Sequence, residues 1–314
     1  MAPGRDRPHD EPYSIAVIQS RAGPDPEQNL RRAADHLRTA AARGARLVIL
    51  PELFRTQYFC QREDASLFTE AEPIPGPTTA VLARQAKELS IVIITSLFER
   101  RAPGVYHNTA IVLDQSGDLV GTYRKMHIPD DPRYYEKFYF TPGDLGFPSI
   151  HTSLGPVGPL ICWDQWFPEA ARASTLAGAE LLAYPTAIGW HPAEKEEVGE
   201  AQRDAWTTVQ RAHAIANGSY VAVANRVGLE HGDIRGNRAD GDGIEFWGSS
   251  FIADPLGRMI CRAGSSEEEV LLATVDPDLI ERTRQHWPFL RDRRIDAYGS
   301  LNRRWVDSMG SADL

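Results

Sequence analysis

Cysteine is scarce in this sequence: only three residues, Cys60, Cys162 and Cys261, occur among 314. An odd and widely spaced set does not suit a framework of disulfide bonds, so we expect reduced thiols and a cytoplasmic protein. The first residues, MAPGRDRPHDEPYS, lack the apolar core of a secretory signal. No stretch approaches the about 18 consecutive apolar residues that a membrane span needs. We therefore expect no membrane partner.

Basic residues are also fewer than acidic ones. The sequence has 34 Lys and Arg against 43 Asp and Glu, a net charge of -9, and no basic run of five residues. Nucleic-acid-binding surfaces are usually basic, so we expect no nucleic-acid partner.

Motifs for bound nucleotides and metals are missing as well. No G-x-G-x-x-G or Walker sequence occurs, and the nine histidines form no H-E-x-x-H pair. Residues 239–245, ADGDGIE, have the carboxylate spacing of part of a calcium loop but lack the glutamate that such a loop places twelfth. We therefore expect neither a metal nor a cofactor.

Apolar segments instead alternate between the two regular periodicities. Spacing of two or continuous apolar runs predict strands, and spacing near 3.6 predicts helices. Strands are predicted at residues 13–19, 46–50, 91–99, 108–114, 119–125, 158–162, 180–185 and 220–225, with a late strand pair at 250–258 and 271–276. Helices are predicted at residues 24–43, 78–89, 168–177 and 201–217 and from 276 onward.

This alternation predicts an α/β layered fold with mixed sheets. We expect one domain over residues 13–297, a flexible extension over residues 1–12 and a C-terminal extension over residues 298–314. The composition, 42% hydrophobic and 25% charged, is that of a globular chain.

Three predicted strands are followed at once by a reactive side chain. Glu52 ends LVILPE, Lys125 lies in GTYRK and Cys162 ends GPLIC. Each alone is more often structural, but a thiol nucleophile needs a base for its proton and a cation for the oxyanion that it creates. We expect the three to converge, with Lys125 and the start of helix 168–177 lowering the pKa of the Cys162 thiol.

Four long segments around these residues resemble the nitrilase superfamily of carbon–nitrogen hydrolases. They are PELFRTQYFCQRED, YRKMHIPDDPRYYEKFYFTPGD, ICWDQWFPEAARASTLAGAELLAYPTAIG, and the pair ANRVG and FWGSSFIADPLG. Their order is also that of the superfamily, and the likeness is greatest to its N-carbamoylputrescine amidase and β-ureidopropionase branch. The resemblance implies a four-layer αββα sandwich, a homo-oligomer, and hydrolysis of a small ureido or amide substrate without a metal.

The resemblance also implies four catalytic residues. Glu52 matches the general base of the family, Lys125 the lysine that stabilises the oxyanion, and Cys162 the nucleophile. Glu136, in YYEKFYF, matches a second glutamate that orders the site.

A further group of residues is expected to contact the substrate: Tyr58, His127, Trp163, Asp164, Trp166 and His191. Asp164 and Trp166 are expected in the pocket wall, and the backbone N–H of Trp163 as a second oxyanion donor. His127 is open to two interpretations, a substrate contact or a structural hydrogen bond. Cys60 is expected to be structural or to line the pocket rather than react.

The substrate class is predicted from charge. The residues after Cys162 offer Asp164 and Glu169 before the first basic residue, Arg172, which suits a cationic substrate tail better than a carboxylate. Within the branch that the chain resembles, N-carbamoylputrescine is therefore the expected substrate, although His191 stands where that branch tends to have glutamate. N-carbamoyl amino acids and ω-amides are the alternatives, and an inactive scaffold is a more remote one.

Overall fold

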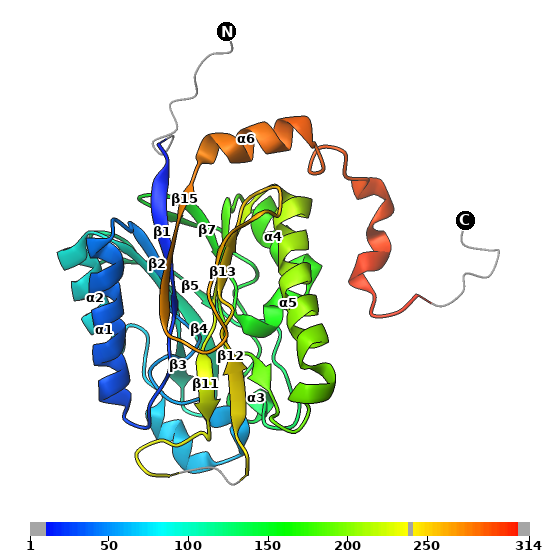
Figure 1. The fold of residues 1–314 in the computed structure, drawn as a ribbon. Helices are drawn as coiled ribbons and strands as arrows, with labels where there is room; N and C mark the ends of the chain where they lie inside the picture. The colour runs from blue at the N-terminus through cyan, green and yellow to red at the C-terminus, as the bar shows by residue number, and fades with distance from the viewer. Residues whose placement is uncertain (1–10, 238–240, 307–314) are drawn as a thin grey trace.

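Two six-stranded sheets form the centre of the molecule (Figure 1). The structure is a computed structural model, and it describes residues 11–237 and 241–306. The first sheet runs, in spatial order, through β15 (Glu269–Val275), β1 (Tyr13–Gln19), β2 (Leu47–Ile49), β3 (Val92–Ala102), β4 (Val105–Leu113) and β5 (Leu119–Arg124). The second runs through β14 (Met259–Arg262), β13 (Phe251–Ala253), β10 (Tyr220–Ala224), β8 (Leu181–Pro185), β7 (Gly155–Pro159) and β6 (Ile150–Thr152).

Both sheets are mixed. β1, β2 and β3 are mutually parallel, as are β7, β8 and β10, whereas hairpins and returning strands add antiparallel neighbours at the edges. A small third sheet joins β11 (Val227–Glu230), β12 (Ile244–Trp247) and β9 (Gly189–Trp190).

Helices cover the outer face of each sheet, as Figure 1 shows. α1 (Pro26–Ala42) and α2 (Pro77–Leu89) pack on the first sheet, and α4 (Pro168–Leu176) and α5 (Lys195–Asn217) pack on the second. α3 (Glu136–Tyr139) is a single turn, and α6 (Pro277–His286) follows the last strand. The expected four-layer αββα sandwich is confirmed.

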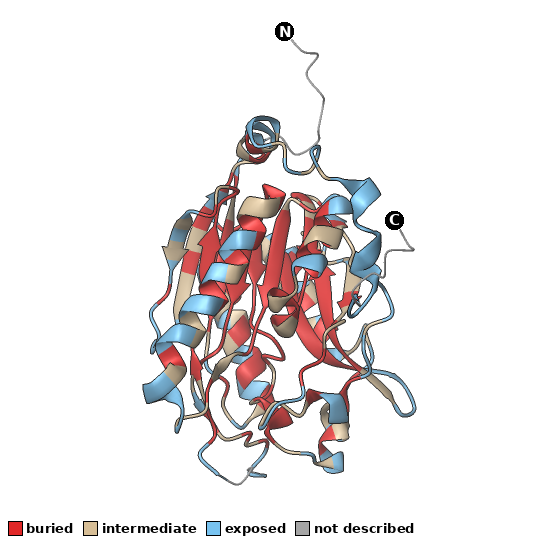
Figure 2. Ribbon diagram, turned by 90° about the vertical axis from the view of Figure 1, so that its right-hand side faces the viewer, coloured by how far each residue is buried: buried red, intermediate tan, exposed pale blue. Residues whose placement is uncertain are grey.

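Alternating side chains of the strands explain this layering. Ile15 and Val17 of β1 join the apolar core between the two sheets, whereas Ala16 and Ile18 join the core under α1 and α2. Both faces of the central strands are therefore buried, and Figure 2 shows these strands in the colour of buried residues. Such strands are apolar throughout, which is why their sequences are continuous hydrophobic runs.

Most predicted elements are present, with three differences. β7 ends at Pro159, so Cys162 does not end a strand but begins a short 3₁₀ helix, η3 (Cys162–Trp166). α5 begins at Lys195 rather than at residue 201. The predicted late pairing is wrong, because β13 pairs with β10 and β14 in the second sheet while β15 pairs with β1 in the first.

The two expected extensions, residues 1–12 and 298–314, lie partly outside the described residues, since residues 1–10 and 307–314 are not described. The same holds for part of the loop 239–245. Over residues 11–237 and 241–306, no helix has both the length and the apolar character that crossing a membrane requires.

Candidate active site

Glu52, Lys125 and Glu136 meet in a buried ion-pair cluster. Lys125 Nζ lies 2.8 Å from Glu52 Oε1 and 2.7 Å from Glu136 Oε2, and all three side chains are fully buried or nearly so. Glu52 follows β2, Lys125 follows β5 and Glu136 begins α3. The sequence-predicted convergence of Glu52 and Lys125 is thus what the structure contains, and Glu136 joins them.

The two oxygens of Glu52 have different surroundings. Oε1 accepts hydrogen bonds from Lys125 Nζ and, at 2.7 Å, from Asn108 Nδ2. Oε2 is buried and has no hydrogen-bond partner among the described residues. A buried carboxylate oxygen without a partner is costly and calls for a functional reason. Here it leaves one acceptor available within a site that otherwise fixes the carboxylate.

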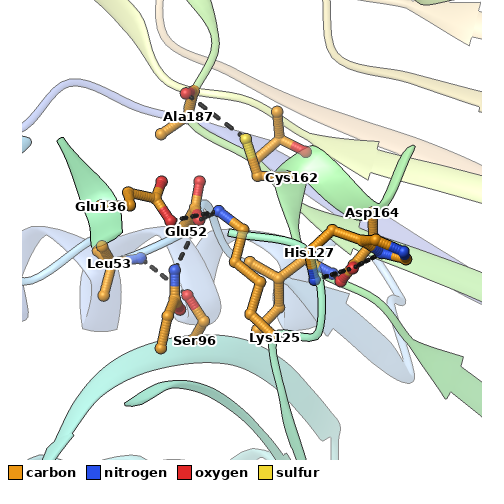
Figure 3. A network of polar contacts seen from close by, with 12 residues as sticks. Glu52, Leu53, Ser96, Lys125, His127, Glu136, Cys162, Asp164 and Ala187 are labelled. Atoms are coloured by element: carbon orange, nitrogen blue, oxygen red, sulfur yellow. Dashed lines mark hydrogen bonds and ion pairs between the residues drawn. The ribbon is translucent and has the colours of Figure 1, made fainter. Parts of the chain in front are cut away.

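Cys162 lies next to this cluster, and Figure 3 shows its sulfur beside the Lys125 ammonium and the two carboxylates. Its Sγ lies 3.7 Å from the carbonyl oxygen of Ala187. Its backbone has φ of 41°, in the left-handed region that residues other than glycine rarely adopt. Such conformations persist only where the surroundings impose them, and they concentrate at functional sites.

Asp164 imposes this turn. Its Oδ2 accepts the Ile161 N–H at 2.9 Å and the Tyr123 hydroxyl at 2.8 Å, and its Oδ1 contacts both the N–H and Nδ1 of His127. Asp164 is completely buried and does not border the cavity described below. Its expected place in the pocket wall is therefore corrected: it is a support beneath the turn.

The pKa of the Cys162 thiol differs in direction from the expectation. Burial, reinforced by the negative charge of Glu52, raises the pKa of Cys162 well above its usual value, and Lys125 opposes this only in part. The predicted net lowering of the Cys162 pKa is therefore wrong, although Lys125 acts in the predicted direction. The sulfur lies in a site whose two carboxylates outnumber its one ammonium, so the resting side chain is a neutral thiol.

Lys125 and Glu136 are also shifted. Burial alone would lower the pKa of Lys125, but Glu136 and Glu52 together raise it well above its ordinary value, so the amine stays charged. Burial raises the pKa of Glu136 to about 7, against the attraction of Lys125.

A cavity of about 410 Å³ opens above Cys162. This is within the range of small-molecule sites. Trp163, Trp166 and His191 border it, as expected for substrate contacts, and Tyr134 and Trp247 add to its aromatic wall. Two carboxylates, Asp131 and Glu194, lie at its exposed side.

Two other expected contact residues lie elsewhere. Tyr58 is fully buried below the cavity and donates its hydroxyl to Glu136 Oε1 at 2.7 Å. His127 contacts Asp164 and stacks on Phe167 with ring centroids 3.7 Å apart, facing a different surface hollow. Of its two interpretations, the structural hydrogen bond is the one that the geometry supports.

The rival thiol, Cys60, is completely buried and does not border the cavity. Burial raises its pKa well above the usual value, and it packs within an aromatic cluster that includes Phe59 and Tyr139. Of the two roles left open for it, the structural one fits. Among the described residues, no group of three or more His, Cys, Asp or Glu side chains is arranged to hold a metal ion.

Sequence reasoning missed Asn108, Asp131 and Tyr134. Asn108 was a detectable signal, because it stands in a strand, β4, whose later residues are all buried, and a buried amide must find a partner. Asp131 and Tyr134 lie in the loop between β5 and α3, where no periodicity shows which side chains face the site.

An αββα sandwich with a glutamate, a lysine and a cysteine gathered at its strand ends is the arrangement that the nitrilase resemblance implied. The chain belongs to the carbon–nitrogen hydrolase family, whose model matches residues 14–285. It is therefore an enzyme that hydrolyses carbon–nitrogen bonds, and the alternative of an inactive scaffold is set aside.

Known relatives cover nearly the whole chain. An N-carbamoylputrescine amidase of Solanum lycopersicum is 43% identical over 92% of this chain and 94% of its own length. A citrullinase of Francisella tularensis is 37% identical over 93% and 98%. The crystal structure of a carbon–nitrogen hydrolase of Helicobacter pylori superposes with a TM-score of 0.89 at 45% identity, covering 94% of this chain and all of that one. The resemblance drawn from the four sequence segments is confirmed.

Proposed function

We propose that Cys162 is the nucleophile of an amidohydrolase reaction and that Glu52 is its general base. The observation that carries this proposal is the unpartnered Glu52 Oε2, an acceptor held within the same buried cluster as a neutral thiol. Because the thiol pKa is raised, the sulfur becomes a nucleophile only as Glu52 removes its proton during attack.

The acylation step then follows from the positions of the charges. The Cys162 sulfur bonds to the carbonyl carbon of the ureido group while its proton passes to Glu52. The carbonyl oxygen becomes an oxyanion that the charged Lys125 and the Trp163 N–H stabilise. When this oxyanion collapses, the carbon–nitrogen bond breaks, and the nitrogen takes the proton from Glu52 and leaves as ammonia.

Hydrolysis of the thioester-like intermediate repeats this sequence with water. Glu52 removes a proton from the water, whose oxygen attacks the carbonyl carbon. The carbon–sulfur bond breaks and the sulfur recovers the proton. A ureido substrate yields a carbamate, which decomposes to an amine and carbon dioxide. No step requires a metal.

We also propose that the substrate is N-carbamoylputrescine or a close N-carbamoyl amine. Its ureido end would sit at Cys162, its methylene chain along the aromatic wall, and its terminal ammonium beside Asp131 and Glu194. None of the described residues that line the cavity is Lys or Arg. The Solanum lycopersicum relative supports the same substrate by name.

A second candidate is a ureido substrate that carries a carboxylate. The relative named citrullinase favours it, and His191 at the cavity is a side chain that can become cationic. The cavity has two carboxylates and one histidine. The carboxylates would repel the carboxylate of an acidic substrate and attract the ammonium of an N-carbamoyl amine, so the amine is the better match.

The substrate preference is the first prediction. We expect kcat/KM for N-carbamoylputrescine to exceed that for N-carbamoyl-β-alanine and citrulline by at least about tenfold, equivalent to about 1.4 kcal/mol. The rate of ammonia release from each substrate measures this preference. Asp131→Asn and Glu194→Gln should each lower kcat/KM for the amine alone. Glu196→Gln, in the first turn of α5, two residues after Glu194 but outside the cavity, is the matched control. A tenfold preference for either acid would overturn the amine assignment.

Assembly into a homo-oligomer is a further part of the proposal. The segment after α6 exposes large apolar side chains, among them Trp287, Ile295 and Trp305, which are 49%, 76% and 81% exposed. Aromatic and arginine side chains of this kind are enriched at protein interfaces.

The oligomer can be tested by mass. Light scattering at micromolar concentration should give at least twice the 34.9 kDa of one chain. A mass equal to that of a single chain would refute the assembly and leave the catalytic proposal untouched. The cytoplasmic location and the single domain at residues 13–297 stay predictions on the grounds given above.

A further inference from the structure

A buried guanidinium lies directly behind the candidate base. Arg226 occupies the junction between β10 and β11, is 1% exposed, and forms an ion pair with Glu230 at 2.9 Å. Burying a charge in this way is costly unless every donor is satisfied. The free-energy cost of burying Arg226 must therefore be offset by hydrogen bonds at this position.

The backbone around Glu52 satisfies that guanidinium. The Glu52 carbonyl accepts from Nε at 3.1 Å and from Nη2 at 2.9 Å, and the Leu53 carbonyl accepts from Nη2 at 2.6 Å. Nη1 donates to the Thr56 carbonyl at 2.9 Å and to the Glu230 carboxylate. All five N–H groups of the side chain thus have an acceptor.

These hydrogen bonds from Arg226 hold a strained turn. Leu53, the residue after Glu52, has φ of 48°, in the left-handed region. Its N–H is held from the other side by Ser96 Oγ at 3.0 Å, a contact that Figure 3 marks. A left-handed leucine persists only where its surroundings over-determine it. Arg226 and Ser96 together fix the direction in which Glu52 leaves the backbone.

The same ion pair also reaches Glu136. Glu230 Oε2 accepts the Tyr58 N–H at 2.7 Å, and the Tyr58 hydroxyl donates to Glu136 Oε1 at 2.7 Å. The other oxygen of Glu136 holds Lys125. One buried pair, Arg226 and Glu230, is therefore linked to both carboxylates that contact the Lys125 ammonium.

We propose that Arg226, anchored by Glu230, is a positioning residue for catalysis. It fixes the backbone at Glu52 and, through Tyr58, the carboxylate of Glu136. Arg226 does not border the cavity, so it acts on the rate of the chemical step rather than on substrate binding. This inference rests on the proposed role of Glu52 as the base.

The test compares Arg226→Ala with the wild-type enzyme. A displacement of a catalytic group by about 1 Å can cost about 100-fold in rate, and we expect a kcat loss of that order with KM unchanged. The truncation leaves a space the size of the lost group, so added guanidinium ion, well below denaturing concentrations, should restore part of kcat. The proposal is overturned if KM rises together with the fall in kcat, or if guanidinium ion restores nothing.

Arg284→Ala is the matched control. Arg284 also donates to backbone carbonyls, those of Ala179 and Asn217, but lies away from the cavity. Its replacement should leave kcat unchanged, with no response to guanidinium ion. If Arg226→Ala does not fold, Arg226→Lys and Tyr58→Phe decide: a wild-type kcat in both overturns the proposal, and a lower kcat at unchanged KM in either supports it.

Glu52→Gln, measured alongside, separates this inference from the proposed function. A wild-type kcat in Glu52→Gln means that the assignment of the base has failed. If Glu52→Gln is inactive while Arg226→Ala keeps its kcat, only the positioning role has failed.

Discussion

Replacing Cys162 by alanine is expected to abolish turnover while the fold persists. Loss of a nucleophile that acts as a unit with its base costs on the order of 10⁶-fold in kcat. The turn at Cys162 is held by Asp164 rather than by the thiol, whose contact with the Ala187 carbonyl oxygen is long, at 3.7 Å. Ammonia release and thermal unfolding, measured together, check both halves of the expectation.

Cys60→Ala is the control for this result. Cys60 is also completely buried but lies outside the cavity, in the aromatic cluster around Phe59. Its replacement should lower stability and keep kcat. If Cys60→Ala were inactive and Cys162→Ala active, the assignment of the nucleophile would be reversed. Iodoacetamide should modify Cys162 faster than Cys60, and faster as pH rises, because the pKa of the Cys162 thiol is raised.

The layers of the fold could be predicted because the central strands are buried on both faces. Runs such as LVI in β2 and LLAYP in β8 are apolar without interruption, and helices of matching amphipathic spacing lie between them. The pairing of the strands was harder to predict from the sequence. β15 follows β14 in the chain yet crosses to the other sheet beside β1, and no local pattern distinguishes that course from a hairpin.

The catalytic candidates were predictable to the extent that they follow strands. Glu52 and Lys125 come directly after buried segments, where the chain leaves the sheet and side chains can converge. Arg226 could not be recognised in the same way. Its partners are carbonyl oxygens of residues 52, 53 and 56, more than 100 positions away in the chain, and a backbone acceptor has no sequence signature.

The protonation state of the thiol was beyond prediction for a related reason. A lysine near a cysteine brings the pKa of the thiol below its usual value only if the charge of the lysine outweighs burial and the nearby carboxylates. Lys125 is balanced by Glu52 and Glu136, and the whole cluster is buried, so desolvation decides the direction. Sequence identifies which charges are present but not how deeply they are buried.

Replacing Glu52 by glutamine is expected to remove most catalysis and, at the same time, to make the thiol more acidic. The glutamine oxygen can keep both bonds that Oε1 now accepts, from Asn108 and Lys125, so the geometry should survive. The atom in the place of Oε2 becomes an NH₂ group, which cannot take the proton of Cys162. Loss of a general base costs about 100- to 10,000-fold in kcat.

The second half of this result distinguishes a base from a merely structural carboxylate. The negative charge of Glu52 is, after burial, the main cause that raises the pKa of Cys162. Its removal should move the midpoint of the pH profile for iodoacetamide alkylation to lower pH, even as turnover is lost. Glu72→Gln is the control, because Glu72 is a buried glutamate paired with Arg55 and lies outside the cavity, and it should change neither property. A kcat near wild type in Glu52→Gln, or a midpoint that moves upward, would show that Glu52 supports the site without accepting the proton.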